Sequence, residues 1–241
     1  MRIDKNNWLI TKPIAHRGLW GGEIIENSIP AYKNAVKNGY PIEIDVYITK
    51  DNHLVSFHDS LLRRMTGCNG YVYEKTLEEL KSLRLLDSNE TIPTFDEVLN
   101  IAENKVPLLI EIKNQPNKKV VDAVVARLKD YKGEFAIQSF NPFYIKRVKK
   151  LAPEFIRGVL SISTKEKLKT VKSNWVVKKM PFNFLIKPDF ISICHDNLPV
   201  KKRKHKKCHV ITWTITCQED ADKSLQHAEN IIFEHFIPNT K

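Results

Sequence analysis

One short stretch, Pro41-Ile42-Glu43-Ile44-Asp45-Val46, places two acids inside an apolar run. Side chains of a β-strand alternate between two faces, so Glu43 and Asp45 share one face while the apolar side chains share the other. Two carboxylates on one face repel each other, and they lose hydration if they are buried. Such a pair either faces solvent, shares a proton, or lies against a cationic side chain or a divalent metal. Oxygen ligands favour calcium, magnesium or manganese over zinc.

A second stretch, Leu108-Leu109-Ile110-Glu111-Ile112-Lys113, repeats this pattern and puts Glu111 and Lys113 on one face. Two shorter apolar runs, Ile14 to Gly18 and Leu54 to Asp59, each end on a histidine beside a charged residue. A single histidine is more often structural than catalytic. Polar groups at the carboxyl ends of parallel strands, however, meet at one edge of a sheet or barrel. We therefore expect both histidines to lie beside the three carboxylates.

The rest of the chain alternates strand and helix patterns. Further strands are expected at Glu134–Phe140, Phe155–Leu160, Asp189–Cys194, His209–Ile215 and Asn230–Phe233, and helices at Ile29–Lys37, Thr76–Leu83, from Pro93 with Thr94 as N-cap, Val120–Lys129, Pro142–Leu151, Lys165–Val171 and Glu219–Glu229. Such alternation requires a parallel sheet with helices outside it. About eight units without a dinucleotide-binding glycine pattern favour a closed (β/α)8 barrel over an open sheet. We expect one domain over residues 1–241, with a small insertion at residues 61–90.

The chain carries a net charge of +11, which suits an anionic substrate, an anionic membrane surface or nucleic acid. The densest basic run, Lys201 to Lys207, is either a solvated loop or a binding patch. We favour the loop, with at most a weak contact to an anionic membrane surface and none to nucleic acid, because no aromatic residue interrupts the run. The four cysteines are scattered, and no apolar run is long enough for export or a membrane span. These features favour a reduced, cytoplasmic setting.

Several short motifs occur in a fixed order along the chain. They are His16-Arg17-Gly18, Glu26-Asn27-Ser28, Glu43-Ile44-Asp45-Val46, Thr49-Lys50-Asp51, Phe57-His58-Asp59, Thr66-Gly67, Glu111-Ile112-Lys113, Gln138-Ser139-Phe140 and Trp213-Thr214. Each alone is weak, but the ordered set resembles the glycerophosphodiester phosphodiesterase family. The resemblance implies a TIM barrel with a small insertion after the second histidine motif. It also implies hydrolysis of a glycerol-linked phosphodiester to glycerol 3-phosphate and an alcohol, with calcium or magnesium as the cation.

The resemblance assigns roles residue by residue. It implies a metal site at Glu43, Asp45 and Glu111, proton transfer by His16 as base and His58 as acid, phosphate binding by Arg17 and Lys113, and a pocket lined by Gln138, Phe140 and Trp213. These residue types fit the reaction. A phosphodiester is anionic, so cations at its oxygens both bind it and stabilise the charge that builds in the transition state. Two histidines can then divide the proton transfers between nucleophile and leaving group.

The chain departs from the family pattern near its C-terminal end. Ile215-Thr216-Cys217 follows the Trp-Thr pair where an asparagine is common, and Ala228 to Glu234 replaces the usual last strand with glycine and aspartate. These departures affect the pocket wall rather than the proposed metal or proton-transfer residues. Two alternatives remain: a phospholipase D-like or lysophospholipid-cleaving activity on the same barrel, and a barrel that binds a phosphoester without catalysis.

Overall fold

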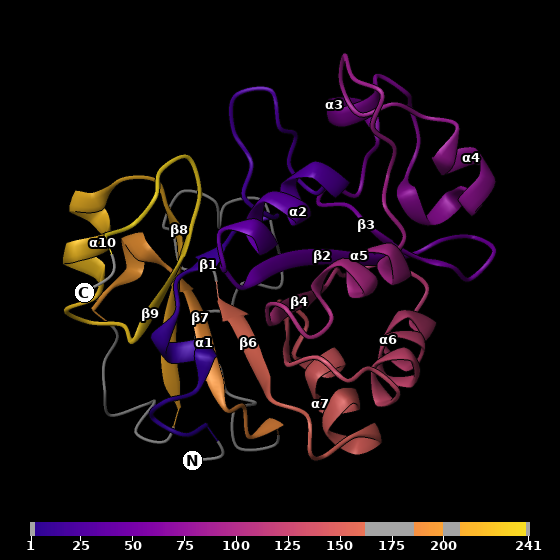
Figure 1. Ribbon diagram of the computed structural model, residues 1–241. Helices are drawn as coiled ribbons and strands as arrows, with labels where there is room; N and C mark the ends of the chain where they lie inside the picture. The colour runs from indigo at the N-terminus through magenta and orange to yellow at the C-terminus, as the bar shows by residue number, and fades with distance from the viewer. Residues whose placement is uncertain (1–2, 162–185, 200–207, 240–241) are drawn as a thin grey trace. The chain divides into compact units, whose positions relative to one another are not determined.

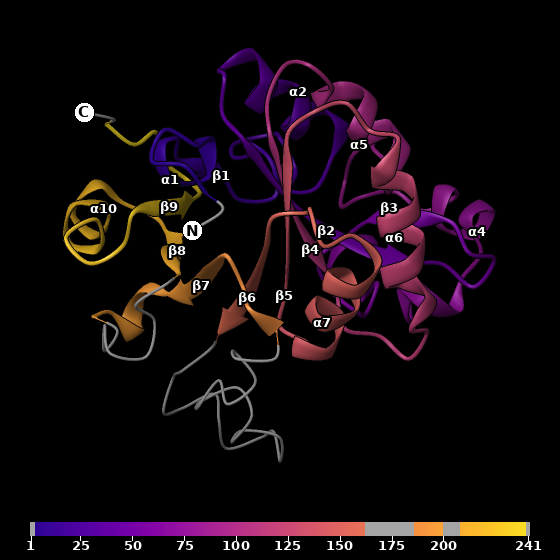
Figure 2. The same cartoon turned by 90° about the horizontal axis from the view of Figure 1, so that it is seen from below.

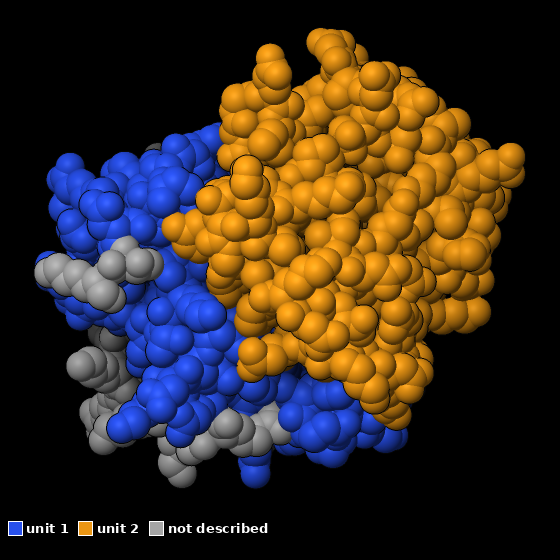
Figure 3. All heavy atoms as spheres, viewed as in Figure 1, with its two compact units in different colours: residues 1–14, 136–241 blue, residues 15–135 orange. Residues whose placement is uncertain are grey.

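The computed structural model describes residues 3–161, 186–199 and 208–239 (Figure 1). The expected helix Lys165–Val171 and the basic run Lys201 to Lys207 lie outside these residues. The chain forms two compact units, which Figure 3 distinguishes by colour. Unit 2 is residues 15–135, and unit 1 is residues 1–14 together with 136–241. No helix among the described residues combines the length and the apolar character that crossing a bilayer requires.

Unit 2 is built around strand β2. Its elements are β1 (Ile14–Ala15, shared with the end of unit 1's first segment), α2 (Ile29–Lys37), β2 (Ile42–Ile48), β3 (Leu54–Ser56), α3 (Arg63–Thr66), η1 (Val72–Glu74), α4 (Leu77–Lys81), α5 (Phe95–Ala102), β4 (Leu108–Ile112) and α6 (Lys119–Lys129). β2 pairs in parallel with β1 and with β4, and all seven of its residues are buried. The β2–β4 register sets Asp45 directly opposite Glu111. The two acidic strands therefore bring their carboxylates to the same place.

Strand β3 differs from the sequence-based expectation. The sequence suggested that the run ending at His58 is a further strand of the parallel sheet, but β3 is antiparallel to β2 and pairs Ile48 with Leu54. The physical reason is the short connection, Thr49 to His53, which can form a hairpin but cannot hold a crossover. Within that turn Thr49 accepts the backbone N–H of His53 and donates to Asp51. His58 thus follows a hairpin strand rather than a barrel strand.

The segment at residues 61–90 contributes to a core that it shares with the hairpin. One apolar cluster joins Tyr47, Val55 and Phe57 to side chains of this segment, among them Leu62 and Leu80. The segment holds α3, η1 and α4, with no strand between them (Figure 1). Its apolar side chains are buried in one cluster with those of β2 and β3. The single domain with this insertion stays a prediction.

Unit 1 contains a run of parallel strands. Its elements are α1 (Trp8–Thr11), β5 (Phe135–Ser139, beginning at the last residue of unit 2), α7 (Pro142–Leu151), β6 (Arg157–Ser161), β7 (Phe190–Cys194), η3 (His195–Asn197), β8 (His209–Ile215), α10 (Gln218–Ser224) and β9 (Asn230–Phe233). Neighbouring strands pair in parallel from β5 to β9, and Figure 2 shows β6 to β9 in this order. Gly158 on β6 is required for packing, because a Cβ there would lie 2.2 Å from the ring of Phe190.

Most helix ends follow local rules that the sequence already displays. Ser28 caps α2, and Thr94 caps α5 as predicted, where it forms a capping box with Glu97. α10 is shorter than expected, because it ends at Ser224 rather than Glu229. The backbone N–H of Glu229 donates to Val210, and its carboxylate accepts the Val210 N–H at 2.7 Å. Pairing with β8 therefore begins at Glu229, before β9, so Glu229 is not part of the helix.

Candidate active site

Three acidic side chains of unit 2 converge in its interior. Glu43 and Asp45 come from β2 and Glu111 from β4, and each offers a carboxylate oxygen within 4.8 Å of the others. Glu43 and Asp45 are each 1% exposed and Glu111 is 6% exposed. The alternation of the strands and the β2–β4 register produce this cluster, as the sequence predicted. The acids are buried and do not face solvent.

Two cations partly neutralise the cluster. The Lys113 ammonium lies 3.1 Å from Asp45 Oδ1 and 3.0 Å from Glu111 Oε1, and Arg17 Nε lies 3.8 Å from Asp45 Oδ2. Burial raises the pKa of Asp45, but Lys113 and His58 outweigh burial and lower it. The pKa of Glu43 is raised well above its usual range by burial and by the neighbouring carboxylates, although it accepts the backbone N–H of Arg17 at 3.0 Å. Negative charge at Glu43 is therefore incompletely balanced.

A buried series of hydrogen bonds orients the Asp45 carboxylate. The Asn27 amide nitrogen donates to Asp45 Oδ2 at 3.0 Å, and the Asn27 oxygen accepts the Tyr32 hydroxyl at 2.8 Å. The Tyr32 hydroxyl lies 2.6 Å from that of Ser56. Asn27 has a positive φ of 49°, which asparagine tolerates better than most residues. This series of hydrogen bonds fixes which way the Asn27 amide faces and holds one oxygen of Asp45.

Both predicted histidines border the acidic cluster. The charges of His58 and His16 each lower the pKa of Asp45, which places both imidazoles within electrostatic reach of that carboxylate. His58 Nδ1 lies 2.6 Å from Asp59 Oδ1, and the His58 side chain is one-third exposed. Burial lowers the pKa of His58, which favours a neutral imidazole. His58 therefore has one ring nitrogen held by Asp59 and the other available for chemistry.

Arginine and glutamate side chains form a second polar layer next to the histidines. Glu26 accepts Arg17 Nη1 at 2.9 Å and is also bound by both terminal nitrogens of Arg64. The same Arg64 binds Asp59, the partner of His58. Sequence reasoning placed Glu26 and Asp59 in motifs without giving them roles, and it missed Arg64. The one sequence signal for the Arg64–Asp59 ion pair is that the two residues lie only five positions apart.

The predicted pocket residues Gln138, Phe140 and Trp213 belong to unit 1. Phe140 and Trp213 pack edge to face, with ring centroids 5.7 Å apart. Gln138 is buried on β5, and its Oε1 has no hydrogen-bond partner among the described residues. The buried Trp213 Nε1 likewise has none there. The structure thus groups the seven candidates for metal binding, phosphate binding and proton transfer within unit 2, and brings Phe140 against Trp213 within unit 1.

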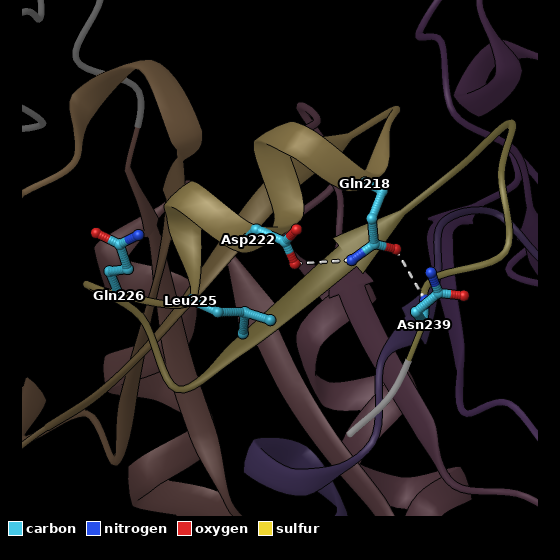
Figure 4. A pocket seen from close by; sticks show the side chains of 5 residues that line it. All are labelled: Gln218, Asp222, Leu225, Gln226 and Asn239. Carbon is cyan, nitrogen blue, oxygen red and sulfur yellow. Dashed lines mark hydrogen bonds between the residues drawn. The ribbon is translucent and has the colours of Figure 1, made fainter.

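A separate hollow of unit 1 has no such chemistry. It has a volume of about 560 Å³ and is lined by Gln218, Asp222, Leu225, Gln226 and Asn239 (Figure 4). The Gln218 amide donates to Asp222 at 2.8 Å, and its oxygen accepts the backbone N–H of Asn239 at 2.8 Å. Both polar ends of the Gln218 amide are therefore already paired, and the described residues that line the hollow hold no cluster of charged groups like that in unit 2. We place the candidate site at the carboxylate cluster.

Known proteins resemble this chain over nearly its whole length. Residues 16–234 match the profile of the glycerophosphoryl diester phosphodiesterase family. A glycerophosphodiester phosphodiesterase of Caldanaerobacter subterraneus is 33% identical over 231 residues, which cover 90% of each chain. A phosphodiesterase of Oleispira antarctica, solved in complex with sn-glycerol-3-phosphate, is 26% identical with a TM-score of 0.79, over 94% of this chain and 93% of that one. The likeness in structure confirms the predicted (β/α)8 barrel class.

A more partial match extends to a lipid-cleaving relative. A human protein named lysophospholipase D GDPD1 is 33% identical over 136 residues, which cover 50% of this chain and 43% of the human protein. The likeness therefore extends to a protein whose name describes cleavage of a lysophospholipid.

Proposed function

Because the chain belongs to the glycerophosphoryl diester phosphodiesterase family, we propose that it hydrolyses a glycerophosphodiester to glycerol 3-phosphate and an alcohol. The observation that carries this proposal is the buried cluster of three carboxylates with Arg17, Lys113 and two histidines around it. The binding of sn-glycerol-3-phosphate by the Oleispira antarctica relative supports the same product class. The site has the charged groups that binding and cleaving a small anionic diester require.

The donor set fits a hard divalent cation. Glu43, Asp45 and Glu111 would hold calcium or magnesium, since all three offer oxygen. Burial and the neighbouring carboxylates raise the pKa of Glu43, and a cation beside it would favour its charged form. When bound, the ion supplies Lewis-acid stabilisation of a phosphoryl oxygen. The Asn27 amide holds the second oxygen of Asp45, and so limits the orientations that this ligand can adopt.

Arg17 and Lys113 bind the phosphate in this proposal. Lys113 is buried between two carboxylates, and although burial lowers its pKa, these carboxylates outweigh burial and raise it, so it stays an ammonium. Arg17 has one terminal nitrogen on Glu26 and its Nε near Asp45. Both cations are fixed before substrate arrives. Fixed charges stabilise a transition state without reorganising during the reaction.

His16 and His58 perform the proton transfers. The Asp59 carboxylate holds His58 Nδ1, which leaves His58 Nε2 to give a proton to the leaving alkoxide. His16 takes the proton from the nucleophile, a division of roles that follows the family. Positioned acid or base catalysis typically accelerates a reaction by about 10²- to 10⁴-fold.

A substrate screen tests the proposal. Purified protein is incubated with glycerophosphodiesters, lysophospholipids and polyglycerol phosphate, with calcium or magnesium added, and glycerol 3-phosphate release is measured. We expect release from a small glycerophosphodiester, and less release from the Glu43→Gln variant in proportion to its weaker metal binding. Preferred cleavage of lysophospholipid would support the second candidate, which the partial match to the human protein favours. Binding of glycerol 3-phosphate without turnover of any substrate would indicate the non-catalytic barrel and contradict the proposal.

A further inference from the structure

We propose that Arg64, from the segment at residues 61–90, is a positioning residue that holds the proton-transfer histidine His58 and the phosphate-binding Arg17 at the same time. This inference rests on the proposed function, because His58 and Arg17 have these roles only in a phosphodiesterase. Arg64 acts through two carboxylates, Asp59 and Glu26, and no contact between it and substrate is proposed.

Arg64 makes two sets of contacts, which we call its two arms. The first arm is the contact with Asp59, which in turn binds His58. Arg64 Nε donates to Asp59 Oδ2 at 2.5 Å, and Arg64 Nη2 reaches Asp59 Oδ1 at 3.2 Å. Asp59 Oδ1 in turn lies 2.6 Å from His58 Nδ1. A carboxylate fixed by a guanidinium in two-point contact cannot rotate freely. Arg64 therefore sets the direction in which Asp59 presents its oxygen, and so the orientation of the His58 ring.

The second arm runs through Glu26. Arg64 Nη2 and Nη1 bind Glu26 Oε1 and Oε2 at 2.6 and 3.2 Å, while Arg17 Nη1 binds the same Oε1 at 2.9 Å. Burial raises the pKa of Glu26, but the hydrogen bond from Arg64 and the charge of Arg17 outweigh burial and lower it. Glu26 is thus an ionised bridge between two guanidinium groups. Without Arg64 the carboxylate could rotate, and Arg17 would lose its fixed partner.

The backbone of Arg64 is well anchored although its side chain is 47% exposed. Its helix, α3, is only one turn long, but the flanking Leu62 and Met65 are buried in the apolar cluster of the segment. Gly67 ends the helix with a φ of 70°, and its N–H donates to the Arg63 carbonyl. The apolar packing below α3 therefore fixes the point from which the guanidinium reaches both carboxylates.

The neighbouring Arg63 provides a matched control. It belongs to the same turn and carries the same charge, and its side chain is exposed. In the described part of the chain, the Arg63 side chain forms no hydrogen bond or ion pair with Glu26 or Asp59. Arg63→Ala removes the same charge from the same helix while leaving both arms intact.

Steady-state kinetics tests the inference with two substrates. One is a glycerophosphodiester with a poor alkoxide leaving group, and the other is its nitrophenyl analogue, which needs little protonation on departure. We expect Arg64→Ala to lower kcat on the alkoxide substrate by roughly 10- to 100-fold, the scale of a misplaced catalytic group. The loss of kcat on the nitrophenyl substrate is expected to be several-fold smaller. Arg64→Lys, which keeps the charge but not the two-point contact, should recover only part of the activity.

A double-mutant cycle isolates the first arm. In a His58→Ala background, Arg64→Ala should have a much smaller effect on kcat than in the wild type, because the group that it positions is gone. The loss of the Arg17 arm should remain as a rise in KM with a smaller fall in kcat, of the same size for both substrates, because Arg17 contacts the phosphate and not the leaving group. Equal losses on both substrates, or additive effects of the two substitutions, would overturn the inference, as would an Arg64→Ala variant no worse than Arg63→Ala.

A spectroscopic readout is independent of turnover. Histidine-labelled, metal-free protein is compared by nuclear magnetic resonance, with His58→Ala used to assign the His58 ring signals. Arg64→Ala and Arg64→Lys should shift the His58 ring nitrogen signals, whereas Arg63→Ala should leave them unchanged. Unchanged His58 signals in folded Arg64→Lys would overturn the inference. Wild-type protein that releases no glycerol 3-phosphate from any diester would instead contradict the proposed function, whatever the spectra show.

Discussion

The two units have parallel strands in common, but they place different side chains on them. On β2 and β4 of unit 2, buried carboxylates alternate with aliphatic residues and are balanced by Lys113 and Arg17. In unit 1 the corresponding candidates are the neutral Gln138 on β5 and Trp213 on β8. Buried charges require partners, which unit 2 supplies from several segments. The comparison shows that the charged candidates lie in unit 2, whereas the pocket candidates of unit 1 are neutral.

The largest expected effect belongs to the histidines of unit 2. His16→Ala and His58→Ala should each reduce turnover by roughly 10²- to 10⁴-fold, since each removes one proton transfer. Metal affinity and the thermal midpoint should change little. A nitrophenyl substrate should rescue His58→Ala much more than His16→Ala. Equal rescue of both variants would contradict the division of roles, and near-normal turnover of the natural substrate would contradict the pair itself.

The next effect concerns the carboxylate cluster. Glu43→Gln should weaken calcium or magnesium binding by at least roughly tenfold, because it removes a charged ligand from a site that depends on charge. Calorimetry on the purified protein measures this affinity directly, and activity should fall together with it. Glu97→Gln, at the start of α5, serves as an acidic control outside the cluster. Unchanged affinity in Glu43→Gln would remove this residue from the metal site.

A smaller effect is expected from unit 1. Trp213→Ala and Phe140→Ala should raise KM by roughly 3- to 10-fold and leave kcat nearly unchanged, because a pocket wall contacts the substrate equally in the ground state and the transition state. Varying the alcohol of the substrate should change the size of this KM effect. A kcat loss as large as that of the histidine variants would break the comparison, since chemistry would then depend on unit 1 as well.

The smallest effect is on stability and depends on pH. The pKa values of Glu26 and Asp59 are lowered because the hydrogen bonds and charges of their partners outweigh burial. A lowered folded-state pKa stabilises the fold fully above the unfolded-state pKa of about 4, and the contribution is lost as the pH falls through the folded-state values. Arg64→Ala should therefore reduce the free energy of unfolding by roughly 1 kcal/mol at pH 7, with partial exposure limiting the effect.

Denaturant titrations across the acid range measure this difference. The wild type and Arg64→Ala should converge in stability as the pH drops below the lowered pKa values, and Arg63→Ala should follow the wild type throughout. A difference between wild type and Arg64→Ala that stays constant down to the lowest pH would mean that packing, rather than charge, accounts for it.

The acidic face of each strand could be predicted because it depends on backbone periodicity alone, whereas the β2–β4 register that joins the two faces depends on strand pairing. Strand alternation puts Glu43 and Asp45 on one face, and the second acidic run adds Glu111 in the same way. The helix N-termini at Ser28 and Thr94 could also be predicted, because an N-cap depends only on the residues next to it. These features need no knowledge of contacts between distant segments, and the structure agrees with each of them.

What could not be predicted depends on contacts between distant residues. The hydrogen bonds from Arg64 to Glu26 join residues 38 positions apart, and the one that the Ser56 hydroxyl donates to the Asn27 amide oxygen spans 29 positions. No periodic pattern reports such pairings. The direction of β3 was missed for a different reason: an apolar run has the same composition in a hairpin and in a parallel sheet, and only the length of the turn before it distinguishes them.

The apolar underside of residues 61–90 has a consequence for how this enzyme family can be engineered. Loops that join elements of a barrel are usually the parts that can be exchanged between relatives to alter specificity. Here the segment shares one apolar cluster with Tyr47 and Phe57 of the hairpin, and it also carries Arg64. A graft that replaces only its exposed turn would keep the underside and the arginine in place. A graft that replaces the whole segment must supply both the apolar residues that fill the shared cluster and an arginine at the position of Arg64.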